Sequence, residues 1–165
     1  MASITHKGNP VSTIGTLPQA GEHLKDFDLI TNGLAHVSLK DFAGKKLVLN
    51  IFPSLDTGTC AASVRAFNKA AAGLENTAVL CISRDLPFAQ ARFCGVEGIT
   101  NAITLSDFAT GQFGKDYGLI LTTGLLAHLL SRAVIVAGAD GRVLYSEQVP
   151  EISQEPDYAA ALAAL

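Results

Sequence analysis

The chain has 165 residues, of which 48% are hydrophobic and 16% charged, so it is long and apolar enough for one domain, residues 1–165, with a sizeable buried core. Its formal net charge is −3, from 12 Lys and Arg against 15 Asp and Glu, and the absence of a basic run argues against nucleic acid as a partner. The N-terminus lacks the apolar core of a secretory signal and no segment approaches the roughly 18 apolar residues of a membrane span, so we expect a cytoplasmic protein that does not contact membranes.

The beginning of the chain is predicted to be rich in β-structure. Gly8-Asn9 separates two short polar and apolar stretches and marks the turn of a small N-terminal hairpin. Asn32-Gly33 is a stronger turn signal, between the stretches 27–30 and 35–39. Residues 47–52 then form a short, β-branched, apolar run, which is typical of a central parallel strand.

A helix follows this strand and begins near Cys60. Apolar side chains recur at helical spacing after the cysteine, at Val64, Phe67, Ala71 and Leu74. Cys60 therefore lies in or just before the first helical turn, where unpaired backbone N–H groups and the helix dipole favour an anion. Such surroundings lower a cysteine pKa from about 8.5 to roughly 3.5–7.5, and the thiolate is the nucleophilic form.

The remaining elements alternate between strand and helix. A second apolar strand, 78–82, leads to a helix that begins near Leu86 and Pro87, for which Asp85 is the predicted N-cap. This helix carries Cys94 and is predicted to fray at Gly95. The elements expected after it are a strand at 103–105, a helix at 108–117, an apolar loop at 118–131, strands at 133–136 and 143–145 around the turn Asp140-Gly141, and a terminal helix capped by Asp157.

This order of elements predicts an α/β fold. The central sheet is expected to be mixed, with helices on both faces, and to end in an antiparallel hairpin. The three cysteines are too few for a disulfide framework. No Cys-x-x-Cys or His-x-x-x-His spacing indicates zinc, so we expect no metal and no other cofactor.

The residues before Cys60 carry a specific motif, Pro-x-x-x-Thr-x-x-Cys, formed by Pro53, Thr57 and Cys60. From about Gly8 to the C-terminus the chain resembles the bacterial thiol peroxidases, the atypical two-cysteine branch of the peroxiredoxins. The matching segments occur in the same order and are Asn50-Ile-Phe-Pro-Ser, Asp56-Thr-Gly, Cys60-Ala-Ala-Ser-Val-Arg65, Asp85-Leu-Pro-Phe-Ala-Gln, Arg92-Phe-Cys-Gly, Ile103-Thr-Leu-Ser, Arg132-Ala-Val and Glu155-Pro-Asp-Tyr.

The resemblance implies a thioredoxin-like fold with an N-terminal hairpin and a set of site residues. It makes Cys60 the peroxidatic cysteine, Cys94 the resolving cysteine, and Thr57 and Arg132 further catalytic residues. Pro53, Thr57 and Arg132 are expected to contact the substrate. That substrate is hydrogen peroxide or an organic hydroperoxide, which Cys60 reduces while becoming a sulfenic acid. An intramolecular Cys60–Cys94 disulfide follows, thioredoxin reduces it, and the antioxidant enzyme is expected to be a homodimer.

Without the resemblance, each residue has a simpler interpretation. Cys60 and Cys94 could be small core residues, Thr57 a turn or capping residue, and Arg132 a surface cation. Cys81 lies inside an apolar strand and is interpreted as an inert buried thiol. The four histidines have neither ligand nor general-base spacing.

Two other functions use the same cysteines. A thiol–disulfide oxidoreductase of the thioredoxin type would ordinarily have a cysteine where this chain has Thr57, which favours peroxide reduction. A peroxide sensor or redox relay could use Cys60 and Cys94 to change shape and signal to a partner. No interaction tail or additional domain in the sequence favours that role.

Overall fold

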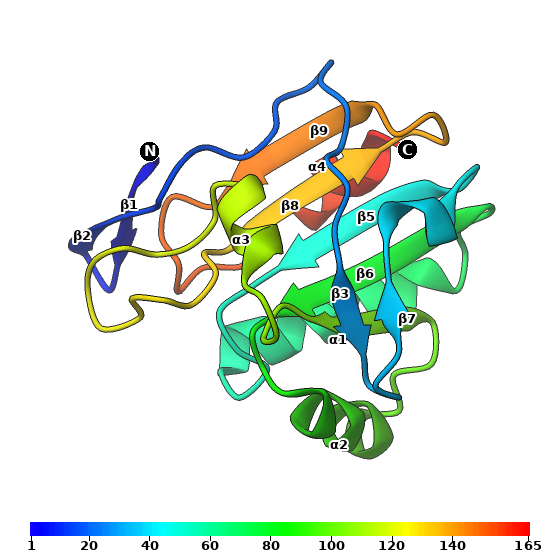
Figure 1. Cartoon of the computed structure of the whole chain (residues 1–165), viewed down its shortest axis with the longest axis horizontal. Coiled ribbons are helices and arrows are strands. Elements are labelled where there is room, and N and C mark those ends of the chain that lie inside the picture. Colours follow the sequence, from blue (N-terminus) through cyan, green and yellow to red (C-terminus); the bar gives the residue numbers. More distant parts are fainter.

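A seven-stranded mixed sheet runs through the molecule, in the order β4-β3-β7-β6-β5-β8-β9, and a separate hairpin of β1 and β2 lies at the N-terminus (Figure 1). The computed structural model describes all residues, Met1–Leu165. The strands are β1 (Ser3–His6), β2 (Asn9–Ser12), β3 (Leu29–Thr31), β4 (His36–Val37), β5 (Lys46–Ile51), β6 (Thr77–Ser83), β7 (Ala102–Ser106), β8 (Ala133–Ala137) and β9 (Val143–Gln148). The helices are the 3-10 helix η1 (Leu39–Phe42) and the α-helices α1 (Gly58–Ala71), α2 (Pro87–Glu97), α3 (Gln112–Asp116) and α4 (Tyr158–Ala163).

Strand β5 lies near the middle of the sheet and places the start of α1. It pairs in parallel with β6 and antiparallel with β8. Leu47, Leu49 and Ile51 point into one hydrophobic cluster, whereas Val48 points into the cluster on the other face. Both faces of β5 are therefore buried, which explains why its sequence is an almost continuous apolar run.

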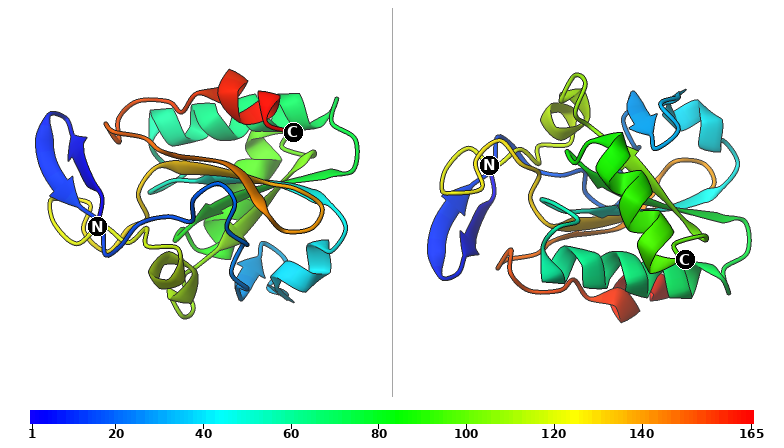
Figure 2. Two further views of the ribbon diagram at one scale, coloured as in Figure 1. Left: turned by 90° about the horizontal axis from the view of Figure 1, so that it is seen from above. Right: turned by 90° about the horizontal axis from the view of Figure 1, so that it is seen from below.

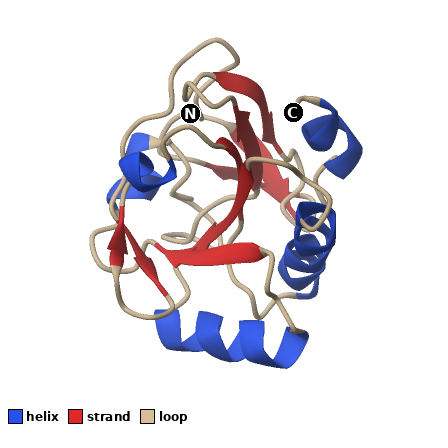
Figure 3. Cartoon of the chain, turned by 90° about the vertical axis from the view of Figure 1, so that its right-hand side faces the viewer, coloured by secondary structure: helices blue, strands red, loops and turns tan.

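Helices cover both faces of the sheet, as predicted. Figure 2 shows α1 and α4 on one face and α3 with η1 on the other, and in Figure 3 the strands lie in the middle with helices around them. Cys60, Val64 and Phe67 of α1 belong to the same cluster as Phe93 and Cys94 of α2. Both cysteine-bearing helices thus pack into one hydrophobic layer.

Helix α2 differs from the prediction at both ends. It continues through Gly95 to Glu97 and ends at Gly98, whose left-handed conformation (φ +65°) suits a glycine, so the predicted fraying at Gly95 is wrong. Asp85 is not the N-cap either, because Leu86 occupies that position without a side-chain cap. The Asp85 carboxylate instead accepts hydrogen bonds from Ser54 Oγ at 2.7 Å and the backbone N–H of Leu55 at 2.8 Å.

The turn of the N-terminal hairpin and the length of α3 also differ from the prediction, whereas the cap of the terminal helix agrees with it. The N-terminal hairpin is present, but its turn is Lys7-Gly8, both with positive φ, rather than Gly8-Asn9. Helix α3 is shorter than predicted. The Asp157 carboxylate caps α4 by accepting from the backbone N–H of Ala160 at 2.9 Å. No helix is both long and apolar enough to cross a membrane.

Candidate active site

The loop between β5 and α1 places Cys60 in the first turn of the helix. Thr57 is the N-cap, with extended backbone angles, and its Oγ1 accepts a hydrogen bond from the backbone N–H of Cys60 at 3.3 Å. The Thr57 hydroxyl in turn donates to Ser54 O at 3.3 Å. The position predicted for Cys60 is confirmed, and so is the capping role that was the simpler interpretation of Thr57.

Arg132 lies immediately before β8 and reaches the Cys60 sulfur. Its Nη2 donates to Cys60 Sγ at 3.3 Å, and its Nε donates to Ile152 O at 2.7 Å. The side chain is only 2% exposed and Cys60 is fully buried. The interpretation of Arg132 as a surface cation is therefore wrong. A fixed cation and the N-terminus of α1 both face the sulfur, and both stabilise a thiolate.

One guanidinium nitrogen of Arg132 remains free. Nη1 is buried and has no hydrogen-bond partner in the protein. A buried donor without a partner is costly, since it has lost its water without gaining an acceptor. The site therefore holds a donor, on the same planar group that touches Cys60, which can bind an incoming oxygen.

A cavity of about 350 Å³ borders Arg132, whose guanidinium contacts the buried Cys60 sulfur. Three predicted substrate contacts, Pro53, Thr57 and Arg132, line it together. The other lining residues are His6, Lys7, Thr59, Leu126, Ile152 and Ser153. Sequence reasoning missed His6 and Lys7, because nothing local to the N-terminal hairpin indicates that it folds back to this cavity.

Cys94 lies on α2, away from the Arg132 contact. It is half-buried, and its Sγ is 3.5 Å from Thr104 Oγ1 on β7. All three cysteines are free thiols in this structure, so Cys60 and Cys94 are not bonded to each other. The fold brings both helices into one layer without joining the two sulfurs.

Cys81 is fully buried on β6, as the sequence predicted. Asn50 Nδ2 approaches its sulfur at 3.7 Å. Burial raises the pKa of the Cys81 thiol to about 12, because the interior disfavours the charged thiolate. At neutral pH the Cys81 thiol is protonated.

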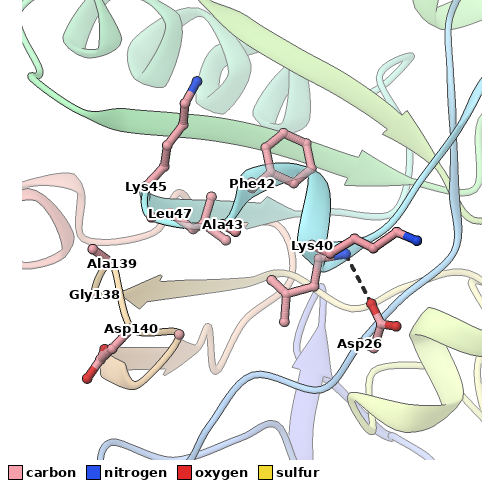
Figure 4. A pocket seen from close by; sticks show the side chains of 12 residues that line it. Asp26, Lys40, Phe42, Ala43, Lys45, Leu47, Gly138, Ala139 and Asp140 are labelled. Atoms are coloured by element: carbon pink, nitrogen blue, oxygen red, sulfur yellow. Dashed lines mark hydrogen bonds between the residues drawn. The ribbon is translucent and has the colours of Figure 1, made fainter.

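A second cavity, of about 380 Å³, lies beside η1 and the turn at 138–141 (Figure 4). Asp26 at its edge accepts a hydrogen bond from the backbone N–H of Leu39 at 3.1 Å. No cysteine lines this cavity. No group of three or more His, Cys, Asp and Glu side chains gathers anywhere in the chain to hold a metal ion. The contact between Arg132 and Cys60 therefore lies apart from this second cavity.

Comparison with known proteins agrees with this geometry. The model of the Redoxin family matches residues 19–162. A thiol peroxidase of Corynebacterium glutamicum is 57% identical over 165 residues, which are 100% of this chain and 99% of that protein. This chain belongs to the thiol peroxidases. It is therefore a peroxidase enzyme of the peroxiredoxin type.

Solved structures confirm the thioredoxin-like fold of this thiol peroxidase. A peroxiredoxin-like protein from Aquifex aeolicus superposes with a TM-score of 0.93 at 34% identity, covering 99% of this chain and 95% of that one. A thiol peroxidase from Chromobacterium violaceum superposes with a TM-score of 0.90 at 23% identity, covering 98% and 93%. The N-terminal hairpin and the mixed sheet predicted from the resemblance are both present.

Proposed function

We propose that this thiol peroxidase reduces hydroperoxides through a Cys60 sulfenic acid and an intramolecular Cys60–Cys94 disulfide. The observation that carries the proposal is the contact of Arg132 Nη2 with Cys60 Sγ at the N-terminus of α1. No other cysteine of the chain has a cation against its sulfur. Cys60 is therefore the thiol whose surroundings best suit a nucleophile.

In the first step the Cys60 thiolate attacks the terminal oxygen of the hydroperoxide. The S–O bond forms as the O–O bond breaks, and the leaving oxygen takes a proton and departs as water or an alcohol. Negative charge develops on that oxygen, and donors fixed before the reaction stabilise it best. We assign this role to Arg132, whose buried Nη1 has no other acceptor.

Thr57 and Pro53 shape the same cavity. Thr57 Oγ1 accepts from the backbone N–H of Cys60 and donates to Ser54 O, which leaves one acceptor position on a residue that lines the cavity. Pro53 is buried and lines the cavity, and we propose that its ring keeps bulk water from the sulfur. We therefore assign both residues to substrate binding.

In the second step Cys94 attacks the Cys60 sulfenic acid, a disulfide forms, and water leaves. The Cα atoms of a disulfide lie within about 7 Å of each other, with the Cβ atoms directed toward one another. Cys60 and Cys94 lie on two different helices that share one hydrophobic cluster, and Cys94 Sγ contacts Thr104 Oγ1 while both cysteines remain free thiols. We therefore propose that the first turn of α1 and the segment 93–98 unwind to let the sulfurs meet.

The cycle closes when a dithiol protein reduces the disulfide by thiol–disulfide exchange. We propose thioredoxin as this partner and a cytoplasmic homodimer as the working form. Both hydrogen peroxide and organic hydroperoxides fit the reaction, because only the terminal peroxide oxygen meets the sulfur.

Mass spectrometry after one equivalent of hydrogen peroxide tests the proposal. We expect a loss of two hydrogen masses and one linked peptide pair, containing Cys60 and Cys94. A link that includes Cys81, or a sulfenic acid retained on Cys94, contradicts the assignment. Continuous peroxide consumption with thioredoxin and its reductase separates turnover from a sensor, which reacts once and stops.

A further inference from the structure

Strand β1 is hydrogen-bonded to the segment 150–152, and the same segment binds the guanidinium of Arg132. The backbone N–H of Thr5 donates to Pro150 O at 2.8 Å, and that of Ile152 donates to Thr5 O at 2.8 Å. These bonds form a parallel bridge between Thr5 and Glu151. The carbonyl of Ile152 then accepts from Arg132 Nε at 2.7 Å. The N-terminal hairpin is thus linked through Ile152 to the guanidinium of Arg132, which contacts Cys60.

The Glu151 carboxylate lies at the centre of this junction. Its Oε2 accepts from Thr5 Oγ1 at 2.7 Å and from the Gly8 N–H at 3.1 Å. Its Oε1 accepts from the Lys7 N–H at 2.9 Å and from the Ser153 N–H at 3.0 Å. An ionised carboxylate offers about four lone-pair positions, and four donors occupy them here.

These contacts lie on both sides of Ile152. Three donors belong to β1 and its turn, and the fourth belongs to the residue directly after Ile152. The carboxylate therefore fixes the backbone whose carbonyl holds Arg132. The guanidinium is planar and rigid, so an anchor at Nε also sets the directions of Nη1 and Nη2.

The backbone of Arg132 is held independently of this junction. Its carbonyl accepts from the Val149 N–H and from Gln148 Nε2, both at 3.0 Å. Loss of the Glu151 contacts would leave β8 paired in the sheet and would loosen only the guanidinium. The effect on the sulfur can therefore be separated from an effect on the fold.

We propose that Glu151 is a positioning residue for the peroxide reaction, which holds the N-terminal hairpin against 150–153 so that Ile152 O aims the Arg132 guanidinium at Cys60. The inference rests on the proposed role of Arg132. The hydrogen bonds to Glu151 also hold the pKa of its carboxyl well below the usual range. The carboxylate stays ionised throughout the pH range in which a thiol peroxidase is assayed.

Replacement of Glu151 by Gln is the direct test, because it keeps the size of the side chain and puts an NH₂ group against backbone donors. In a Cys94→Ser background, which leaves Cys60 as the reacting thiol, we expect oxidation by hydrogen peroxide about tenfold slower than in the Cys94→Ser parent, since small misplacements of catalytic groups are costly. The pKa of Cys60, from the pH dependence of iodoacetamide alkylation, should rise.

Three further variants make the test specific. Glu75→Gln changes an exposed glutamate whose side chain makes no hydrogen bond, and it should match the parent. Thr5→Val removes one of the four donors and should slow oxidation less than Glu151→Gln does; it carries the test if Glu151→Gln fails to fold. In an Arg132→Lys background, Glu151→Gln should have no further effect on the rate, because it acts through the guanidinium.

The outcomes distinguish a failure of the inference about Glu151 from a failure of the proposed role of Arg132. An unchanged rate and an unchanged Cys60 pKa in folded Glu151→Gln overturn the positioning role, as do additive effects of Glu151→Gln and Arg132→Lys. If Arg132→Lys alone leaves the rate unchanged, the proposed function fails first. If Arg132→Lys slows oxidation and Glu151→Gln does not, only the inference about Glu151 falls.

Discussion

Arg132 Nη2 lies 3.3 Å from the sulfur of Cys60, although the two residues are 72 positions apart in the sequence. The register of the sheet explains this contact. Ala133 of β8 pairs with Ile51 of β5, so Arg132 lies beside the point where the chain leaves β5 for the loop to α1. A slip of one residue in this pairing would turn the guanidinium to the other face.

Substitution of Cys60 by Ser should reduce peroxidase activity to the background rate. An alcohol does not ionise at neutral pH, so the variant has no anionic nucleophile to attack the peroxide. Peroxide consumption with thioredoxin and its reductase measures the effect. Cys81→Ser is the matched control and should keep its activity if it folds, because the buried Cys81 thiol is protonated. Activity that survives without Cys60 and disappears without Cys81 would reverse the assignment.

Substitution of Arg132 by Lys should slow the reaction of Cys60 with peroxide by about a hundredfold, the effect typical of removing one fixed donor to a developing oxyanion. Lysine keeps the charge but lacks the planar fork that reaches Ile152 O and Cys60 Sγ at once. Stopped-flow measurement of Cys60 oxidation gives the rate. Arg142→Lys, at an exposed arginine that contacts Gly21 O, is the control. Equal rates for Arg132→Lys and wild type would exclude a role for the guanidinium in activating peroxide.

Thr57→Val should slow oxidation and also destabilise the protein. The variant loses the hydroxyl that borders the cavity and the side-chain cap of α1, and loss of such a cap costs about 1 kcal/mol. Thr57→Ser retains the hydroxyl and should restore most of the oxidation rate and most of the stability. Stopped-flow oxidation and thermal unfolding measure them separately. A Val variant that is less stable but oxidises at the wild-type rate would limit Thr57 to capping.

Disulfide formation should loosen the first turn of α1 and the segment 93–98. Hydrogen exchange of the reduced and disulfide forms tests this, with faster exchange in both segments as the expected result. Cys94→Ser should stop the cycle at a Cys60 sulfenic acid, which a dimedone-type reagent traps and excess peroxide over-oxidises. Unchanged protection in both segments, with the disulfide confirmed by mass, would rule out local unfolding.

The ion pair of Arg65 with Glu97 should slow this unwinding. It joins α1 to α2 through two contacts, Nε to Oε2 at 2.7 Å and Nη2 to Oε1 at 2.9 Å. Arg65 lowers the pKa of the Glu97 carboxyl, so the stabilisation is complete above the ordinary carboxyl pKa and is lost only as the pH falls through the lowered value.

At neutral pH, Glu97→Gln should therefore speed conversion of the sulfenic acid to the disulfide by about twofold, since exposed ion pairs are weak. Single-turnover kinetics measures that step. Glu155→Gln, at a glutamate that contacts Tyr158 instead, is the control and should leave the rate unchanged. A slower or equal rate in Glu97→Gln would show that the two helices do not separate along this pair.

The sequence by itself determined the features that depend on residues close together along the chain. The apolar run of β5, the turn at Asp140-Gly141 and the place of Cys60 in a first helical turn were all predicted, because spacing and backbone preference express them locally. The predicted turn at Asn32-Gly33 is present between β3 and β4, but its left-handed residue is Leu34. The errors at Asp85 and Gly95 have one kind of cause. The Asp85 carboxylate binds Ser54 and Leu55, about thirty positions away, and is therefore not used as a helix cap. Helix α2 stays helical through Gly95 because the preceding residues, Phe93 and Cys94, pack against the core.

The tertiary structure alone decided how the site is assembled. It buried Arg132 against Cys60, brought His6 and Lys7 to the rim of the cavity, and joined Glu151 to donors more than 140 residues away. No local pattern encodes these contacts, since each depends on strand order and register across the sheet. The motif therefore identifies the nucleophile, while the pairing of β5 with β8 and of β1 with 150–152 places the groups that activate it.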